Sequence, residues 1–504
     1  MMAGVKCKWV RMRAVAALPF SVACTETVPG VHQRQVGDAT VGPDSSGSDA
    51  SSSLPEASTI PDATALSSPD AMTTSSDDGG MTDAEAGLPE GSVAYSPDAA
   101  PPTGSFCSLP GSVVWTAQGP MTIPGASAPT VDVTWLRLPT GFCAHYFATV
   151  KTARQLRFAP GGELFAASPS SGTTGGRGDG ISGIVVLPDD NHDGNADTNI
   201  TFIGGIPSVQ ALMFANSSFY YQNGTNILRV PYNKGDRQPS GLSVPVAAMS
   251  PAWLQAPEHW PRAMDQAQDG TIYITNGGSQ SDPCESMPMV RGAVVKLNPA
   301  DGGTSLVAKG FRNPIAMRCE ANHNVCLAVE LALDYSGSAA GREKLVPVRQ
   351  GDDWGFPCCA TQNTPYGGAM TETGAVPDCS GVSLESDAFV IGHTPFGVDF
   401  ETGIWPAPWT GRAFVTLHGE VGTYYGARVV GIALDSTGMP LQASEVDPSV
   451  GEPDNMLQFA TGWDDGRQDH GRPAPITFAP DGRMFIGDDQ MGAVIWIAPV
   501  TLMK

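Results

Sequence analysis

Short runs of apolar residues alternate with turns rich in Gly, Asp and Asn from about residue 107 to the C-terminus. One pattern occurs near both ends of this region, as FAPGGELF at residues 158–165 and as FAPDGRMF at residues 478–485. A looser version, QDGTIYIT, covers residues 268–275. Each copy places a tight glycine turn between two strand-like runs, which is the pattern of a β-hairpin.

Hairpins that recur through roughly four hundred residues, with almost no helical period, predict an all-β fold. A β-propeller and a long array of β-sandwiches both fit this pattern. Because no inner linker divides residues 107–504, we favour a single β-propeller over that whole region.

The segment before the propeller has a different composition. Residues 25–106 are rich in Ser, Asp, Ala, Pro and Thr, with thirteen acidic residues against the single basic residue Arg34. Such a segment cannot bury enough apolar surface to offset the entropy cost of ordering it. We therefore expect a disordered linker, which serves either as a tether for the propeller or only as a solvated spacer.

The first 24 residues have the layout of an export signal, with four basic residues followed by ten mostly apolar ones. This apolar run is too short to span a bilayer. Small residues directly before Cys24 resemble a bacterial lipoprotein cleavage box. We expect export to the periplasm or cell surface, and leave open whether Cys24 carries a lipid anchor.

Charge and cysteine content agree with export. The formal net charge of −23 excludes nucleic acid as a partner, because binding it requires a basic face. Apart from Cys7 and Cys24 the chain has eight cysteines, an even number that predicts disulfides in an exported protein. Cys319 and Cys326 flank a turn and could bridge a hairpin, whereas the other pairings stay open.

Residues 310–314, GFRNP, carry the most informative candidate chemistry, and they lie between strand-like runs at residues 293–297 and 326–329. Pro314 biases Asn313 toward extended backbone, so Arg312 and Asn313 should lie at the mouth of a strand. A guanidinium beside an amide forms a donor-rich clamp for a ligand that carries carbonyl groups.

His259 lies 53 residues before Arg312, about one propeller blade away. Equivalent points of neighbouring blades converge on the central channel, so both side chains could face one ligand. An imidazole is the natural general base near neutral pH. The alternative is an ordinary histidine in a surface loop.

Arg472 also precedes a strand, the one that opens the FAPDGRMF hairpin. Around these residues, six motifs follow one another in order: the histidine before a hairpin, GFRNP at 310–314, GDDWGFP at 351–357, HTPFG at 393–397, AFVTLHG at 413–419, and GRP with APDG between 471 and 482. This series resembles the soluble quinoprotein sugar dehydrogenases, the glucose/sorbosone dehydrogenase family, over about residues 135–500.

The resemblance implies a six-bladed propeller that uses pyrroloquinoline quinone (PQQ) and calcium to oxidise a sugar and pass the electrons to an acceptor. It implies that His259 removes the hydroxyl proton while hydride passes to the quinone. Arg312 and Asn313 would polarise the quinone oxygen, and Arg472 would face the cofactor's carboxylates.

Two further positions are taken from the resemblance. Glu330 keeps an acidic position in the strand whose backbone carbonyls help to hold calcium in the family, although Leu331 replaces a polar residue there. His418 stands in the region of a cofactor-lining lysine. We count Glu330 and His418 as cofactor-binding residues, and keep as the alternative a catalytically inactive propeller that binds carbohydrate or protein at the cell envelope.

Residues 189–197, DDNHDGNAD, match the first part of a calcium-binding loop. Asp189, Asn191, Asp193 and Asp197 would supply oxygen ligands at alternating positions. The bidentate glutamate of such loops is missing, since Ile200 stands at its position. A structural calcium site and a plain turn rich in Asp and Asn both remain open.

Overall fold

The computed structural model describes residues 103–125, 131–171, 179–249, 259, 263–278, 284, 291–332, 343–385, 387–389, 392–420, 422–441, 455–465 and 470–504. The chain divides into two compact units, Met1–Ala86 and Gly87–Lys504, and the described residues all belong to the second unit. The predicted export signal and nearly all of the predicted linker lie outside the described residues.

Six antiparallel sheets of at least four strands form the blades of this unit. Blade one contains β4 (Gln155–Phe158), β5 (Leu164–Ser168), β6 (Gly183–Leu187) and β7 (Ile200–Gly204). Blade two contains β8 (Leu212–Ala215), β9 (Ser218–Asn223), β10 (Asn226–Pro231) and β11 (Val244–Ala248). Blade three contains β12 (Met264–Gln266), β13 (Ile272–Asn276), β14 (Ala293–Leu297) and β15 (Thr304–Lys309).

The other three blades follow the same order. Blade four contains β16 (Asn313–Cys319), β17 (Cys326–Leu331), β18 (Glu343–Pro347) and β21 (Asp387–Phe389). Blade five contains β22 (Pro395–Phe400), β23 (Ala413–Leu417), β24 (Arg428–Ile432) and β25 (Met456–Ala460). Blade six contains β26 (Pro473–Phe478), β27 (Met484–Asp488), β28 (Ala493–Pro499) and β3 (Phe142–Thr149), with β1 (Val113–Thr116) and β2 (Gly119–Thr122) added outside.

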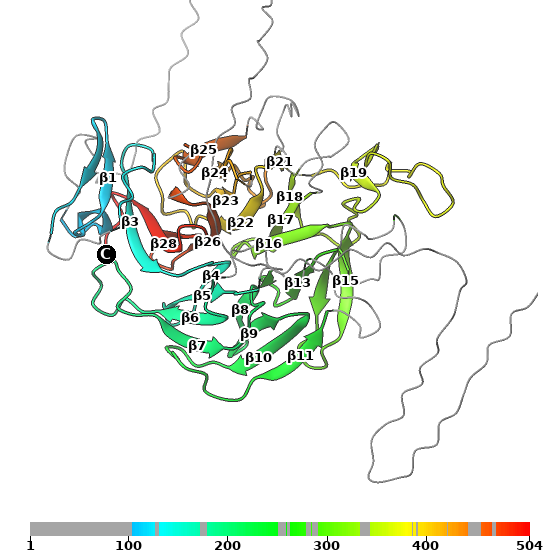
Figure 1. The fold of residues 1–504 in the computed structure, drawn as a ribbon, viewed down its shortest axis with the longest axis horizontal. Helices are drawn as coiled ribbons and strands as arrows, with labels where there is room; N and C mark the ends of the chain where they lie inside the picture. Colours follow the sequence, from blue (N-terminus) through cyan, green and yellow to red (C-terminus); the bar gives the residue numbers. More distant parts are fainter. Residues whose placement is uncertain are drawn as a thin grey trace, which may run out of the picture. The chain divides into compact units, whose positions relative to one another are not determined.

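The first strand of each blade lies innermost. These six strands contact one another in the order β4, β8, β12, β16, β22, β26 and back to β4, which closes a ring around a central channel (Figure 1). The predicted all-β, six-bladed propeller is therefore confirmed. The three repeated hairpins form the two innermost strands of blades one, three and six, with Gly162, Gly270 and Gly482 at positive φ in their turns.

The ring is closed by pairing the beginning of the propeller with its end. Strand β3 comes from the start of the region and pairs antiparallel with β28, the last strand of the chain. A short 3-10 helix, η1 (Phe106–Ser108), precedes it, and a disulfide between Cys107 and Cys143 ties the two together.

The apolar core is divided among the gaps between blades, because each sheet buries both of its faces against its neighbours. Blades one and two share a cluster that includes Phe165, Phe202 and Phe219, and blades five and six share one that includes Trp405 and Phe478. Trp354, Trp405, Trp409, Trp463 and Tyr424 are all buried, so they serve packing, whereas Tyr425 is exposed.

All eight cysteines of the propeller are paired. The predicted hairpin disulfide between Cys319 and Cys326 is present in blade four. Cys284–Cys358 and Cys359–Cys379 brace a segment between β18 and β21 that also holds the small strands β19 (Cys359–Thr361) and β20 (Thr364–Pro365). Four disulfides are typical of a protein in an oxidising compartment, which agrees with the expected export.

Candidate active site

One end of the channel collects the predicted catalytic and cofactor-binding residues. In each blade the innermost strand begins where the second strand ends, because the two pair antiparallel. Arg312 and Arg472 stand directly before β16 and β26. His418 follows the last residue of β23 and therefore lies at the same end.

Arg312 is buried and held at two points. Its backbone N–H donates to Oε1 of Glu330 at 2.8 Å, and its Nη1 donates to the carbonyl of Ala332 at 2.6 Å. Burial raises the pKa of Glu330, against the opposing charges of Lys344 and Arg312. Glu330 thus fixes the backbone of Arg312 through this hydrogen bond.

His259 lies beside Arg312. The N–H of Gly277 donates to the carbonyl of His259 at 3.1 Å, and the next N–H, of Gly278, donates to the carbonyl of Arg312 at 2.7 Å. A Cβ at Gly277 would lie 2.4 Å from the Cβ of His259 and 2.8 Å from the carbonyl oxygen of Arg312. Only glycine fits this position without displacing one of the two.

The ring of His259 has a defined tautomer. Its Nδ1 lies 2.7 Å from the carbonyl oxygen of Gly278. A carbonyl can only accept, so Nδ1 carries the proton and Nε2 is the basic nitrogen of the neutral ring. This is the state that a general base requires.

Asn313 begins β16 and is buried, but its side-chain Oδ1 has no hydrogen-bond partner among the described residues. An unsatisfied amide in a buried position is costly. Oδ1 can only accept, so a ligand with a hydroxyl or another donor group at this end of the channel would satisfy it.

A second cluster is formed by residues of blades five, six and one. Arg472 donates from Nε to the carbonyl of His418 at 2.7 Å and from Nη2 to the carbonyl of Gly419, and its guanidinium lies over the ring of Tyr424. Burial lowers the pKa of Arg472 to about 10. The predicted cofactor residues Arg472 and His418 are therefore in contact.

His418 is bound on its other side by an aspartate. Its Nε2 lies 2.9 Å from Oδ1 of Asp489, whose Oδ2 lies 3.0 Å from Nη2 of Arg154. Burial lowers the pKa of His418 to about 4, although Asp489 opposes the shift. Burial would raise the pKa of Asp489, but Arg154 and His418 outweigh it and hold that pKa well below its usual range. The pair is thus a neutral imidazole beside a charged carboxylate.

Arg154 and Asp489 are functional candidates that the sequence analysis missed. Arg154 is 3% exposed, and its Nε and Nη1 have no hydrogen-bond partner among the residues that the structure describes. One signal was present: Arg154 directly precedes β4 just as Arg312 precedes β16 and Arg472 precedes β26. The structure thus places three buried arginines at equivalent points of blades one, four and six.

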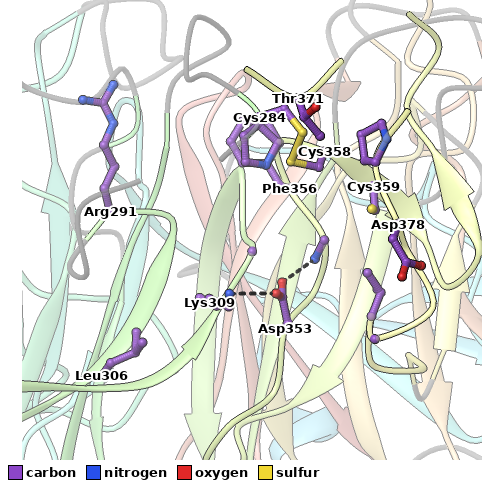
Figure 2. A pocket seen from close by; sticks show the side chains of 16 residues that line it. Cys284, Arg291, Leu306, Lys309, Asp353, Phe356, Cys358, Cys359, Thr371 and Asp378 are labelled. Atoms are coloured by element: carbon purple, nitrogen blue, oxygen red, sulfur yellow. Dashed lines mark hydrogen bonds and ion pairs between the residues drawn. A yellow bond between two sulfur atoms is a disulfide. The ribbon is translucent and has the colours of Figure 1, made fainter. Parts of the chain in front are cut away.

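A cavity of about 580 Å³ adjoins Gly310, the first residue of the GFRNP segment, and Figure 2 shows the side chains that line it. It lies between blade three and the disulfide-braced segment of blade four. Gly310 and the ion pair between Lys309 and Asp353, 3.0 Å apart, line it together with the disulfide Cys284–Cys358.

The opposite end of the channel holds a separate set of ion pairs. Arg318 lies 2.6 Å from Asp399, and Arg157 lies 3.3 Å from Asp265. Of the predicted site residues, those of the calcium loop lie at this end of the propeller, where Asp189 lines a pocket with the hairpin turns at Gly162 and Asp481.

In the predicted calcium loop, residues 189–197, side-chain oxygens accept hydrogen bonds from backbone N–H groups of the same loop. Oδ1 of Asn191 accepts from the N–H of Asp193, Oδ1 of Asp193 accepts from that of Asn195, and Oδ2 of Asp197 accepts from that of Asp190. These oxygens act as hydrogen-bond acceptors of a turn, so calcium binding by this loop remains a prediction.

Neither a metal cluster nor a membrane-spanning helix is found in the described part of the chain. No group of three or more His, Cys, Asp or Glu residues there could hold a metal ion. No helix there is long and apolar enough to cross a membrane. In the strand expected to help hold calcium, the Ala332 carbonyl accepts from Arg312. Residues 333–342, which follow this strand, lie outside the described residues, so calcium binding at this strand remains a prediction.

Comparisons with known proteins support the fold. A family model described as a domain of unknown function, DUF7133, matches residues 129–329. No curated protein sequence matches the chain. Two structures of a carbohydrate-active enzyme of family AA12 from Trichoderma reesei, one with calcium and one with iodide, are 16% identical, with TM-scores of 0.59 and 0.60. They match 74% of this chain and 99% and 100% of their own.

The holo form of the pyranose dehydrogenase PQQ domain from Coprinopsis cinerea is 14% identical, with a TM-score of 0.54, and the match covers 74% of this chain and 98% of that one. At such identities the likeness concerns the fold. The chain therefore shares its six-bladed propeller with these proteins, as the resemblance of its motifs implied.

Proposed function

We propose that this protein is a PQQ-dependent dehydrogenase that oxidises a sugar or related aldose. One observation carries the proposal: buried arginines stand at equivalent points of three blades, at the channel end that also holds His259 and the unsatisfied amide of Asn313. The PQQ domain of pyranose dehydrogenase, which shares the fold, agrees with this cofactor.

The residues at this end fit PQQ, which carries three carboxylates and quinone carbonyls. Buried arginines with unused N–H groups, as in Arg154, match carboxylates, because a guanidinium can bind them with two parallel hydrogen bonds. Arg154 and Arg472 would hold the acidic groups, with His418 between them. Arg312 and Asn313 would contact the quinone oxygen.

The chemistry divides between cofactor and protein. PQQ, when bound, supplies a quinone that accepts a hydride from the sugar. Nε2 of His259 takes the proton from the hydroxyl group at the carbon that is oxidised. Arg312 and Asn313 supply fixed donors where negative charge builds up. We assign no step to calcium.

A second candidate is a propeller that binds carbohydrate or protein without turnover. It is favoured by the segment after Glu330, where Leu331 replaces a polar residue and Arg312 uses the Ala332 carbonyl. In this case the same channel end would bind a ligand but no quinone.

The test is to titrate the full chain with PQQ, with and without calcium, and to follow the quenching of tryptophan fluorescence. Reduction of an artificial electron acceptor is then measured with a panel of sugars. His259→Ala should abolish turnover and leave PQQ affinity unchanged, whereas His192→Ala, at an exposed histidine, should change neither. Absence of both PQQ binding and turnover would favour the second candidate.

A further inference from the structure

Lys344 is a lysine with almost no contact to solvent. It is 2% exposed and lies in β18, the third strand of blade four, directly opposite Glu330 of β17. An ammonium group is strongly hydrated in water, and burying it is costly unless protein groups replace that water. A buried lysine beside a proposed active site therefore requires an explanation.

Two groups replace the water around Lys344. Its Nζ donates to the carbonyl of Trp354 at 2.9 Å and lies 3.9 Å from Oε2 of Glu330. The lysine thus joins a carboxylate of β17 to the turn at residues 351–357.

Both of these neighbours touch the segment that carries Arg312. The other oxygen of Glu330, Oε1, accepts from the backbone N–H of Arg312 at 2.8 Å. In the turn, the N–H of Trp354 donates to the carbonyl of Lys309, and the N–H of Phe356 donates to that of Gly310, both at 2.9 Å. The approach is close, since a Cβ at Gly310 would lie 2.7 Å from the nitrogen of Trp354.

We propose that Lys344 is a positioning residue, which fixes the backbone of Arg312 through Glu330 and the 351–357 turn and thereby orients the clamp on the quinone. The catalytic role of Lys344 rests on the proposed function. The structural link from Lys344 to Arg312 does not depend on it. A buried carboxylate that loses its cation is strongly destabilised and moves to other donors or to water. The N–H of Arg312 would then lose a charge-assisted hydrogen bond.

The experiment compares Lys344→Met with Lys296→Met. Lys296 is a matched control, because it lies in strand β14 of the neighbouring blade three and faces the carboxylate of Asp269, yet it is only partly buried and takes no part in the contacts that join Lys344 to Arg312. Hydrogen exchange of the Arg312 amide is first measured by mass spectrometry with residue resolution, on protein without cofactor. PQQ affinity, kcat and KM for the best sugar follow.

In Lys344→Met we expect the Arg312 amide to exchange roughly tenfold faster or more, because it loses a hydrogen bond to a charged group. In Lys296→Met it should exchange at the wild-type rate. PQQ affinity and kcat should fall in Lys344→Met with little change in KM for sugar, and Lys344→Arg should restore part of both. If Lys344→Met does not fold, the neutral pair Glu330→Gln with Lys344→Met takes its place. It should fold and still show faster Arg312 exchange.

Wild-type exchange of Arg312 in either folded Lys344 variant would overturn the inference, and so would equal effects of the Lys344 and Lys296 substitutions. These results are separate from the proposed function. If the wild-type protein binds no PQQ, the proposed function fails, while the exchange rates still decide whether Lys344 positions Arg312.

Discussion

The neutral, buried imidazole of His418 makes a sharp prediction about the pH dependence of stability. Its pKa is about 4 in the folded protein, against 6.5 for an unperturbed histidine. Between these two values the unfolded chain binds a proton at this position and the folded chain does not. The free energy of unfolding must therefore fall as the pH falls below 6.5, until it levels off below about 4.

The magnitude follows from proton linkage. With these two pKa values, His418 costs the folded state about 1 kcal/mol at pH 5.5, about 2–3 kcal/mol at pH 4.5, and almost nothing at pH 7.5. Carboxylates add their own pH dependence, so the difference between wild type and a variant is the quantity to measure.

His418→Gln keeps an N–H that can donate to Asp489 but removes the titrating group. Urea unfolding, followed by tryptophan fluorescence at constant ionic strength with the disulfides intact, is compared at several pH values from 4.5 to 7.5. Relative to wild type, the variant's free energy of unfolding should rise by about 2–3 kcal/mol between pH 7.5 and pH 4.5. For His192→Gln, at an exposed histidine, the free energy of unfolding should vary with pH as it does in wild type. Parallel curves for His418→Gln as well would refute a neutral buried imidazole at this site.

Three further predictions concern other parts of the propeller. Phe165→Ala, in the core between blades one and two, should cost about 3–5 kcal/mol in urea unfolding, whereas Leu242→Ala, which is 88% exposed, should stay within about 0.5 kcal/mol of wild type. Gly277→Ala should lower PQQ-dependent turnover at least about tenfold, because a displacement of about 1 Å can cost far more than that in rate; full turnover would contradict the tight contact. Asp489→Asn should cost about 3–5 kcal/mol in the same unfolding assay, since it leaves the buried Arg154 without its carboxylate. A loss below about 1 kcal/mol would show that the ion pair is not buried in solution.

Local features of the fold could be predicted from the sequence because they depend on neighbours along the chain. The strand-like run at residues 293–297 is β14, with the same bounds. Pro314 places Arg312 and Asn313 at a strand mouth, where the structure has them. The short spacing between Cys319 and Cys326 allowed their pairing to be suggested.

The parts that escaped prediction depend on residues that are distant along the chain. Arg154 meets Asp489 only because the ring brings blades one and six together. Lysine is a residue type that is rarely buried, but neighbouring blades and the 351–357 turn cover Lys344 in β18. The even number of cysteines predicted disulfides, yet the partners of Cys284 and Cys379 are set by the braced segment of blade four.

The pairing of β3 with β28 also has a consequence for the chain while it is being synthesised. Cys107, beside η1, lies 391 positions before Ala498, whose carbonyl its sulfur contacts. At about 5–20 residues per second, synthesis of the chain between β3 and β28 takes roughly 20 to 70 seconds. Throughout that interval β3 has an unpaired edge that invites association with other chains. The last strand made, β28, is thus the one that ends the exposure of β3, and a chain that stops short of β28 leaves that edge of the propeller unpaired.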